Sequence, residues 1–241
     1  MKSDFPQVRT DDLHHAYFDP FGGNLNARES CLTVKEAFVK EGGNFVQAFV
    51  NPGQIHSGKL EDIKLSNGSS VRADAYLFAC GSWLGQLFPG VLADVITCTK
   101  QEVYYLGVPK EHSQAYDSMP VWIDVDGKDF YYGIPGNANR GFKIGVDRRG
   151  EKFDPTNGER LSDPAVLDHA RKFIAHRFPG LKDAPLLESR VCPYENSPDG
   201  NFVFDKHPDA GNLVFLGGGS GHGFKHGPAL GEYVANYLAG G

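Results

Sequence analysis

The sequence is poor in cysteine and has no long apolar run, and each shortage excludes a class of protein. Four cysteines, Cys31, Cys80, Cys98 and Cys192, occur among 241 residues. Their number and irregular spacing fit neither a disulfide framework nor a Cys-x-x-Cys zinc site, so we expect no bound metal and a reducing compartment. No stretch approaches the length of a membrane-spanning helix, about 18 consecutive apolar residues.

The charge pattern and the first residues of the chain exclude further classes of protein. The formal net charge is -6 and no long basic run is present. The cluster of basic residues that binding to nucleic acid requires is therefore missing. The first six residues, MKSDFP, bring charge and a proline where a secretory signal peptide needs an apolar segment. We expect a soluble cytoplasmic protein with neither a nucleic-acid nor a membrane partner.

The first hundred residues predict an α/β layer. A strand and a turn are expected at 16–25, a helix at 27–43 that ends in a Gly-Gly pair, and a strand at 44–50. The Asn-Gly pair at 67–68 is a strong hairpin signal. Residues 75–80, AYLFAC, are typical of a buried strand, and the Gly-Ser pair after them opens a helix. Such alternation of helices and strands is characteristic of an α/β layer.

The pattern changes to a period of two in the middle of the chain. Apolar and polar residues alternate in four runs between residues 97 and 150, which predicts an antiparallel sheet. Residues 163–178 predict a helix stopped by a Pro-Gly pair. The chain then has a strand at 212–218, a glycine-rich turn at 217–227 and a helix at 228–240 with proline in its first turn. The expected fold is α/β, or mixed α+β.

The glycine-rich turn, GGGSGHGFKHG at 217–227, is the strongest candidate for a ligand site. Small residues after a buried strand leave backbone N–H groups able to face a ligand at a helix N-terminus, where negative charge is favoured. A parallel sheet also places ligands at the carboxyl ends of its strands. A tight turn without a ligand would have the same composition, and a phosphate would suit the site as well, so these interpretations remain open.

Four segments in collinear order carry a family resemblance. They are ADAYLFACGSWLGQLFP at 73–89, NRGFKIGVD at 139–147, RVCPYENSPDGNFVFDKHP at 190–208 and GGGSGHGFKHGPALGEYVA at 217–235. Together they resemble the FAD-dependent amine and amino-acid oxidases of the sarcosine oxidase type. The second segment is similar to the strand with that family's oxygen-activating lysine, the third to the segment with its flavin-attachment cysteine, and the fourth to its carboxy-terminal flavin-contacting motif.

The resemblance implies two interleaved domains. It assigns 1–24 to the end of the substrate domain, 25–96 to a partial FAD-binding domain, 97–190 to an antiparallel-sheet substrate domain and 191–241 to the return of the FAD-binding domain. Family members begin with a βαβ unit bearing G-x-G-x-x-G, which binds the pyrophosphate, and the sequence has no such unit. We therefore expect an incomplete Rossmann-like layer, with the amino-terminal segment lost or on another chain.

Lys143 is the candidate for oxygen activation. It shares one face of its strand with Gly145 and Asp147, and Gly145 leaves space beside it. By resemblance Lys143 lies near flavin N5, where a fixed cation stabilises the negative charge that develops on oxygen. By pattern alone it is a solvated strand lysine. Asp147 stands where some sarcosine oxidases have histidine, which leaves the amine substrate open.

The resemblance gives roles to further residues. Cys192 corresponds to the cysteine that forms a thioether with the flavin, and Tyr194 lines the substrate pocket; otherwise they are a buried free cysteine and a core aromatic. Lys225 helps to hold the substrate carboxylate and His222 lies beside flavin or substrate; otherwise they are a surface lysine and a turn histidine. The expected cofactor contacts are Cys192, Gly219, Ser220, Gly221, His222, Gly223, Phe224 and Lys225.

The activity that the resemblance implies is FAD-dependent oxidation of the C–N bond of a secondary amine or N-substituted amino acid. The partners are that small-molecule substrate and dioxygen, and the products are an imine and hydrogen peroxide. Without the ADP-binding unit the chain is expected to be inactive by itself. The alternative is a non-catalytic remnant or an interaction module, which a flavin absorption spectrum would distinguish.

Overall fold

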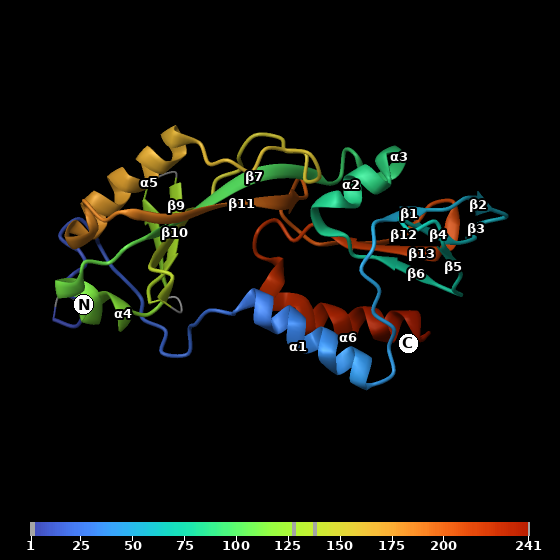
Figure 1. The fold of residues 1–241 in the computed structure, drawn as a ribbon, viewed down its shortest axis with the longest axis horizontal. Coiled ribbons are helices and arrows are strands. Elements are labelled where there is room, and N and C mark those ends of the chain that lie inside the picture. The colour runs from blue at the N-terminus through green and yellow to red at the C-terminus, as the bar shows by residue number, and fades with distance from the viewer. Residues whose placement is uncertain (1–2, 127–128, 137–138, 241) are drawn as a thin grey trace. The chain divides into compact units, whose positions relative to one another are not determined.

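The chain divides into two compact units, whose elements are labelled in Figure 1. A computed structural model describes residues 3–126, 129–136 and 139–240. Unit 1 comprises Met1–Asn24, Lys100–Glu151 and Asn157–Cys192, and unit 2 comprises Leu25–Thr99, Lys152–Thr156 and Pro193–Gly241. The short stretch 152–156 thus returns to unit 2 between two parts of unit 1.

Unit 1 is built on a five-stranded sheet with the order β11-β7-β10-β9-β8. Its strands are β7 (Thr97–Leu106), β8 (Trp122–Asp126), β9 (Asp129–Ile134), β10 (Phe142–Val146) and β11 (Leu186–Asn196). The central strand β10 pairs antiparallel on both sides, with Lys143 opposite Tyr105 of β7 and Ile134 of β9. The period-two pattern therefore predicted four of its strands, β7 to β10, but not β11. Lys128, the first residue of the run expected to form β9, lies outside the described residues.

Helix α5 (Pro164–Arg177) covers the apolar face of this sheet and was predicted from the sequence. The Asp163 carboxylate caps its start by accepting the Ala165 N–H at 2.7 Å. The Phe173 ring stacks on Tyr131 of β9 with the ring centroids 3.7 Å apart. The helix and strands β7, β9 and β10 share one hydrophobic cluster. The shorter helices of unit 1 are η2 (Lys110–His112), α4 (Ser113–Asp117) and η4 (Pro179–Leu181).

A buried arginine holds the amino-terminal segment within unit 1. Arg177 is 3% exposed, and its guanidinium lies 2.7 Å from a carboxylate oxygen of Asp12 and 2.7 Å from one of Asp124. Hydrogen bonds from Arg177 and His176 keep the pKa of Asp12 well below its usual range. The amino-terminal residues therefore pack with the sheet of unit 1.

Unit 2 contains a three-stranded sheet with the order β12-β13-β6. The strands are β6 (Tyr76–Phe78), β12 (Val203–His207) and β13 (Ala210–Gly217). Strand β13 runs parallel to β6, with Leu213 opposite Tyr76 and Phe215 opposite Phe78. These four side chains are buried in one cluster. The parallel pair of unit 2 and the antiparallel sheet of unit 1 confirm the mixed α/β fold class.

The other strands of unit 2 are short. They are β1 (Val50–Pro52), β2 (Ile55–His56), β3 (Lys59–Leu60), β4 (Ile63–Leu65) and β5 (Ser70–Val71). The predicted Asn-Gly turn joins β4 to β5, with Gly68 at φ +85°. Two strand predictions were wrong, because 16–25 form no strand and only the last residue of 44–50 belongs to one. Alternating apolar residues there meet no partner strand in the described part of the chain.

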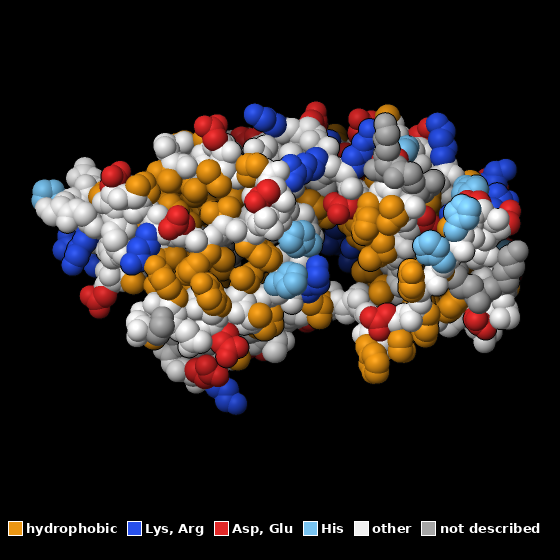
Figure 2. Space-filling view, turned by 180° about the vertical axis from the view of Figure 1, so that it is seen from behind, with side chains coloured by type: hydrophobic (Ala, Val, Ile, Leu, Met, Phe, Trp, Pro, Cys, Tyr) orange, Lys and Arg blue, Asp and Glu red, His pale blue; other side chains and the backbone are white. Residues whose placement is uncertain are grey.

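The helices of unit 2 leave much apolar surface exposed. Helix α1 (Ala27–Lys40) buries none of its residues, and its Phe38 side chain is 51% exposed. Helix α6 (Gly227–Leu238) buries only Val234. Figure 2 shows apolar side chains gathered in surface patches, which are common where another segment or protein binds. No helix in the described ranges is long and apolar enough for a membrane crossing.

The remaining helices of unit 2 are short. The Gly-Ser pair opens η1 (Gly81–Trp83), followed by α2 (Leu84–Leu87) and α3 (Pro89–Leu92).

Leu213→Ala should destabilise the protein strongly, because it removes a side chain that is 0% exposed between β13 and β6. We expect the free energy of unfolding to fall by about 2–5 kcal/mol, the usual cost of such a cavity. Urea unfolding followed by circular dichroism measures the change. Leu238→Ala makes the same chemical change at a position 41% exposed and should cost less than about 1 kcal/mol. Equal losses would contradict the assignment of Leu213 to the core.

Candidate functional site

The glycine-rich turn follows β13 and has a backbone that favours glycine. Gly218, Ser220 and Gly221 have φ values of +74°, +44° and +83°, a region that is strained for residues with a side chain. The chain then forms the 3-10 helix η5 (Gly223–His226), which leads into α6. The second half of the predicted turn is therefore helical rather than irregular.

The end of β11 fixes this backbone through Glu195. The Glu195 carbonyl oxygen accepts the Ser220 N–H at 2.8 Å, and Glu195 Oε1 accepts the Gly219 N–H at 3.3 Å. Some N–H groups expected to face a ligand are thus used within the protein. The N–H groups of Gly221 and Gly223 form no hydrogen bond with the described part of the chain. These two donors remain available to a ligand.

Tyr194 lies against the turn at Gly221. A Cβ atom added to Gly221 would be 2.1 Å from an atom of the Tyr194 ring, so a larger residue does not fit. The sequence suggested that the glycines allow close approach of a ligand, but at this position a tyrosine of the protein occupies the space. The structure therefore brings Tyr194 and the turn together and gives Gly221 a packing role.

His222 and Lys225 lie together in the turn, and both are exposed. Lys225 Nζ donates to the His222 carbonyl oxygen at 3.0 Å. His222 Nε2 is 3.1 Å from the Gly200 carbonyl oxygen, so Nε2 carries the hydrogen in this contact. The Phe202 ring packs edge-on against His222. Lys225 forms no ion pair within the described ranges, and its charge is open to an anionic ligand.

Lys143 is half-buried on β10, whose Phe142, Ile144 and Val146 face the core. Its Nζ lies 5.6 Å from the centre of the Tyr132 ring, a distance at which an ammonium is attracted to the ring. The expected space beside Gly145 is filled, because a Cβ atom there would be 2.5 Å from the same ring. Because glycine has no side chain, the Tyr132 ring occupies this space.

Lys143 and Cys192 influence each other electrostatically within unit 1. Burial raises the pKa of the Cys192 thiol, and the charges of Lys143, Arg190 and Arg160 partly oppose this. Burial also lowers the pKa of Lys143, and the positive charges of Arg140 and Arg190 lower it further, whereas a Cys192 thiolate raises it. Each group thus stabilises the charged form of the other, but burial has the larger effect on both, so the thiol pKa is raised and the lysine pKa is lowered on balance.

Three charged residues beside this pair, Glu188, Arg140 and Arg190, were missed as site residues in the sequence. Glu188 accepts a hydrogen bond from Arg140 at 2.8 Å and another from Arg190. The Arg140 guanidinium also lies 4.2 Å from the centre of the Tyr105 ring. A signal was available, since residues 188, 190 and 192 alternate along β11 and so share one face of the strand.

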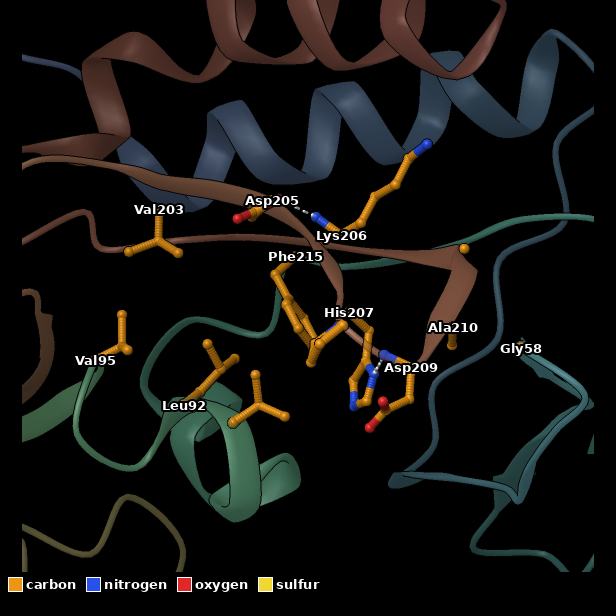
Figure 3. Close-up of a pocket in the computed structure, with 13 residues that line it drawn as sticks. Gly58, Leu92, Val95, Val203, Asp205, Lys206, His207, Asp209, Ala210 and Phe215 are labelled. Carbon is orange, nitrogen blue, oxygen red and sulfur yellow. Dashed lines mark hydrogen bonds between the residues drawn. The ribbon is translucent and has the colours of Figure 1, made fainter.

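A cavity of about 840 Å³ lies elsewhere in unit 2 (Figure 3). Its buried polar group is His207, whose Nδ1 accepts the Asp209 N–H at 3.0 Å, and apolar walls come from Leu92, Val95 and Phe215. None of the residues predicted for the site lines it. Within the described ranges, no cluster of His, Cys, Asp or Glu side chains could hold a metal ion.

Solved structures define the class of fold. The iminodiacetate oxidase of Chelativorans sp. BNC1 superposes with a TM-score of 0.78 at 20% identity and covers 99% of this chain and 61% of that one. An Amadoriase I mutant of Aspergillus fumigatus gives 0.78 at 20% identity, covering 90% of this chain and 52% of that one. At this identity the likeness shows the fold alone, which is that of these oxidases.

Sequence comparison identifies the family. The FAD dependent oxidoreductase family matches residues 1–237, and the chain therefore belongs to it. The monomeric sarcosine oxidase of Bacillus sp. (strain NS-129) is 28% identical over 232 residues, covering 95% of this chain and 59% of that protein. The N-methyl-L-tryptophan oxidase of Salmonella heidelberg (strain SL476) is 27% identical over 241 residues, covering 98% and 62%. The chain thus spans roughly three fifths of the length of these relatives.

Lys143→Met should slow alkylation of Cys192, because it removes a positive charge that stabilises the reactive thiolate. At pH 8 we expect the rate with iodoacetamide to fall several-fold, or about tenfold if the thiol pKa rises by one unit. Mass spectrometry of peptides gives the rate, with the exposed Cys31 as internal reference. Lys206→Met, which removes an exposed lysine of unit 2, is the control. An unchanged rate in Lys143→Met would show that the lysine charge does not reach the thiol.

Proposed function

We propose that the complete protein is a FAD-dependent oxidase of secondary amines or N-substituted amino acids. The family match over residues 1–237 carries this proposal. The glycine-rich turn supports it, because the remaining N–H donors of Gly221 and Gly223 and the cation of Lys225 suit a ring that gains negative charge on reduction. The names of the sarcosine and N-methyl-L-tryptophan oxidases favour a small N-substituted amino acid as substrate.

Bound FAD would supply the redox chemistry, taking a hydride from the carbon beside the amine nitrogen and reducing dioxygen, so that the products are an imine and hydrogen peroxide. The residues of the protein would bind and orient the substrate and stabilise the charges that develop during the reaction. We propose that Lys225 binds the substrate carboxylate, since it is exposed and lacks an ion pair with the described residues. His222 would lie beside it, and Tyr194, packed on the same turn, would line the substrate pocket.

Lys143 is proposed to stabilise negative charge on oxygen. Its partly buried ammonium is held over Tyr132 and is not screened by an ion pair with the described residues, so its field is stronger than that of a solvated lysine. Because its pKa is lowered, the ammonium form is lost at lower pH than for an ordinary lysine. The oxygen reaction should therefore weaken as the solution becomes alkaline.

Cys192 is proposed to attach the flavin covalently, through a C–S bond that would replace a C–H bond of a flavin methyl group, with two protons and two electrons passed to dioxygen to give hydrogen peroxide. The attacking group must be the thiolate, and the positive charges of Lys143, Arg190 and Arg160 favour that form against the effect of burial. Cys192 lies only two residues before Tyr194 on β11, so one strand carries a group for attachment and a group for the substrate pocket.

We propose that this chain provides only part of the FAD site. It contains no G-x-G-x-x-G unit. In the described part of the chain β6 is the end strand of its sheet, and α1 buries none of its residues. Both features suit a layer that βαβ elements of the same or another polypeptide would complete.

The chain alone should retain little FAD, because the pyrophosphate-binding turn that the family uses is not in this sequence. After incubation with excess FAD and gel filtration, we expect absorbance near 450 nm to show far less than one flavin per chain. Riboflavin, which lacks the ADP portion, should bind about as well as FAD in a fluorescence titration. A yellow protein with stoichiometric FAD would contradict this expectation, and failure to bind either compound would favour the non-catalytic alternative.

Lys143→Met in a completed protein should slow reoxidation of the reduced flavin by about two orders of magnitude or more, since a fixed charge at the reacting centre contributes several kcal/mol. The completed protein would carry the amino-terminal FAD-binding segment of a related oxidase. Stopped-flow absorbance separates reoxidation from reduction by the amine, which should change much less. Lys206→Met should leave both steps unchanged. Equal losses of rate in both steps would indicate that the substitution disrupts the whole site. An unchanged rate of reoxidation would show that Lys143 does not activate oxygen.

A further inference from the structure

The side chain of Glu195 is an unusual group to find beneath the glycine-rich turn. Its Oε1 accepts the Gly219 N–H, but its Oε2 is buried and has no hydrogen-bond partner in the described part of the chain. The next residue of the turn is held by the Glu195 backbone, whose carbonyl oxygen accepts the Ser220 N–H. One residue of β11 thus contacts two consecutive amides of the turn.

The Glu195 side chain also explains why glycine occupies two positions whose backbone is not in the left-handed region. Gly217 and Gly219 have no positive φ, so their conformations would accept other residues. A Cβ atom at Gly217 would lie 3.0 Å from Glu195 Oε2, and one at Gly219 would lie 3.1 Å from Oε1. At Gly217, the Leu84 side chain is closer still, at 2.7 Å. The carboxyl group therefore fills space that these glycines leave.

The surroundings of Oε2 favour an uncharged carboxyl group. Gly217, beside Oε2, is also flanked by the apolar side chains of Leu84 and Ile96. Cys80 is a titratable neighbour, and its own pKa is raised by burial and by Glu195. Burial raises the pKa of Glu195 and outweighs the backbone amides that lower it. A carboxylate without a counter-charge is costly in such a place.

We propose that Glu195 is the positioning residue of the glycine-rich turn and that it acts as an uncharged carboxyl group. In this form its side chain fixes the Gly219 amide, next to the Ser220 amide that its backbone carbonyl oxygen holds, without adding negative charge beside the Gly221 and Gly223 donors. Only the link to flavin rests on the proposed function; the effect on the turn does not depend on it.

Hydrogen exchange of the Gly219 and Ser220 amides tests the proposal on the chain as it is. Glu195→Gln keeps the shape and an amide oxygen acceptor, so at pH 3.5 its protection factors should match those of the unmodified protein. Glu195→Ala leaves the Gly219 amide without its acceptor and should lose at least about tenfold of the protection, the effect expected for one buried hydrogen bond. Glu232→Gln, at an exposed position of α6, is the matched control and should change nothing.

The pH profile separates positioning by an uncharged group from simple packing. Folding raises the pKa of Glu195, so its contribution is complete below the usual glutamate range, near 4.3, and declines as pH rises through the folded value. Between pH 3.5 and pH 8, protection corrected for intrinsic exchange should fall about tenfold relative to Glu195→Gln for each unit by which the pKa is raised. The same pH dependence of protection in the unmodified protein and in Glu195→Gln would show that Glu195 does not act as an uncharged group. Full protection in Glu195→Ala would overturn the positioning role.

A riboflavin fluorescence titration tests the link to the cofactor separately. Glu195→Gln should retain the affinity of the unmodified protein, and Glu195→Ala should lose at least about tenfold, in step with its loss of amide protection. Equal affinity of the two variants would overturn the link between Glu195 and the flavin. If the unmodified protein binds no riboflavin, the proposed function fails, while the exchange measurements still decide whether Glu195 positions the turn.

Discussion

The parallel pairing of β13 with β6 is the constraint on which the candidate site of unit 2 depends. It fixes the direction of β13, so that the glycine-rich turn comes at the carboxyl end of a strand in a parallel pair, the edge at which such sheets bind ligands. The pair is buried through side chains of both strands. The turn therefore starts from a rigid position, and the hydrogen bonds of Glu195 need to order only the few residues beyond Gly217.

Features that depend on local sequence were predictable. The period-two runs located β7 to β10, the segment 163–178 located α5, and the Asn-Gly pair at 67–68 marked the β4–β5 turn. Each is decided by residues a few positions apart. The strand expected at 44–50 failed because a strand also needs a hydrogen-bonded neighbour, and alternation of side chains does not supply one.

The roles of the glycines were harder to predict because they depend on distant residues. Composition correctly located the turn, and the family resemblance named the residues within it, but Gly221 is required by the Tyr194 ring and Gly219 leaves room for the Glu195 carboxyl group. Lys143 shows the same limit, since the space beside Gly145 is taken by Tyr132 from the neighbouring strand. Strand alternation predicts which face a residue occupies, whereas the neighbour that fills the space follows from register and tertiary packing.

The path of the chain between the two units has a consequence for folding and for evolution. The chain changes unit after residues 24, 99, 151, 156 and 192, which makes five crossings, and the stretch 152–156 is a visit of only five residues. Neither unit is a continuous segment, so each can close only after parts far apart in sequence have met. A high contact order of this kind slows folding. Exchange of one unit between related genes would likewise require several simultaneous recombination points, so the two units are expected to be inherited together.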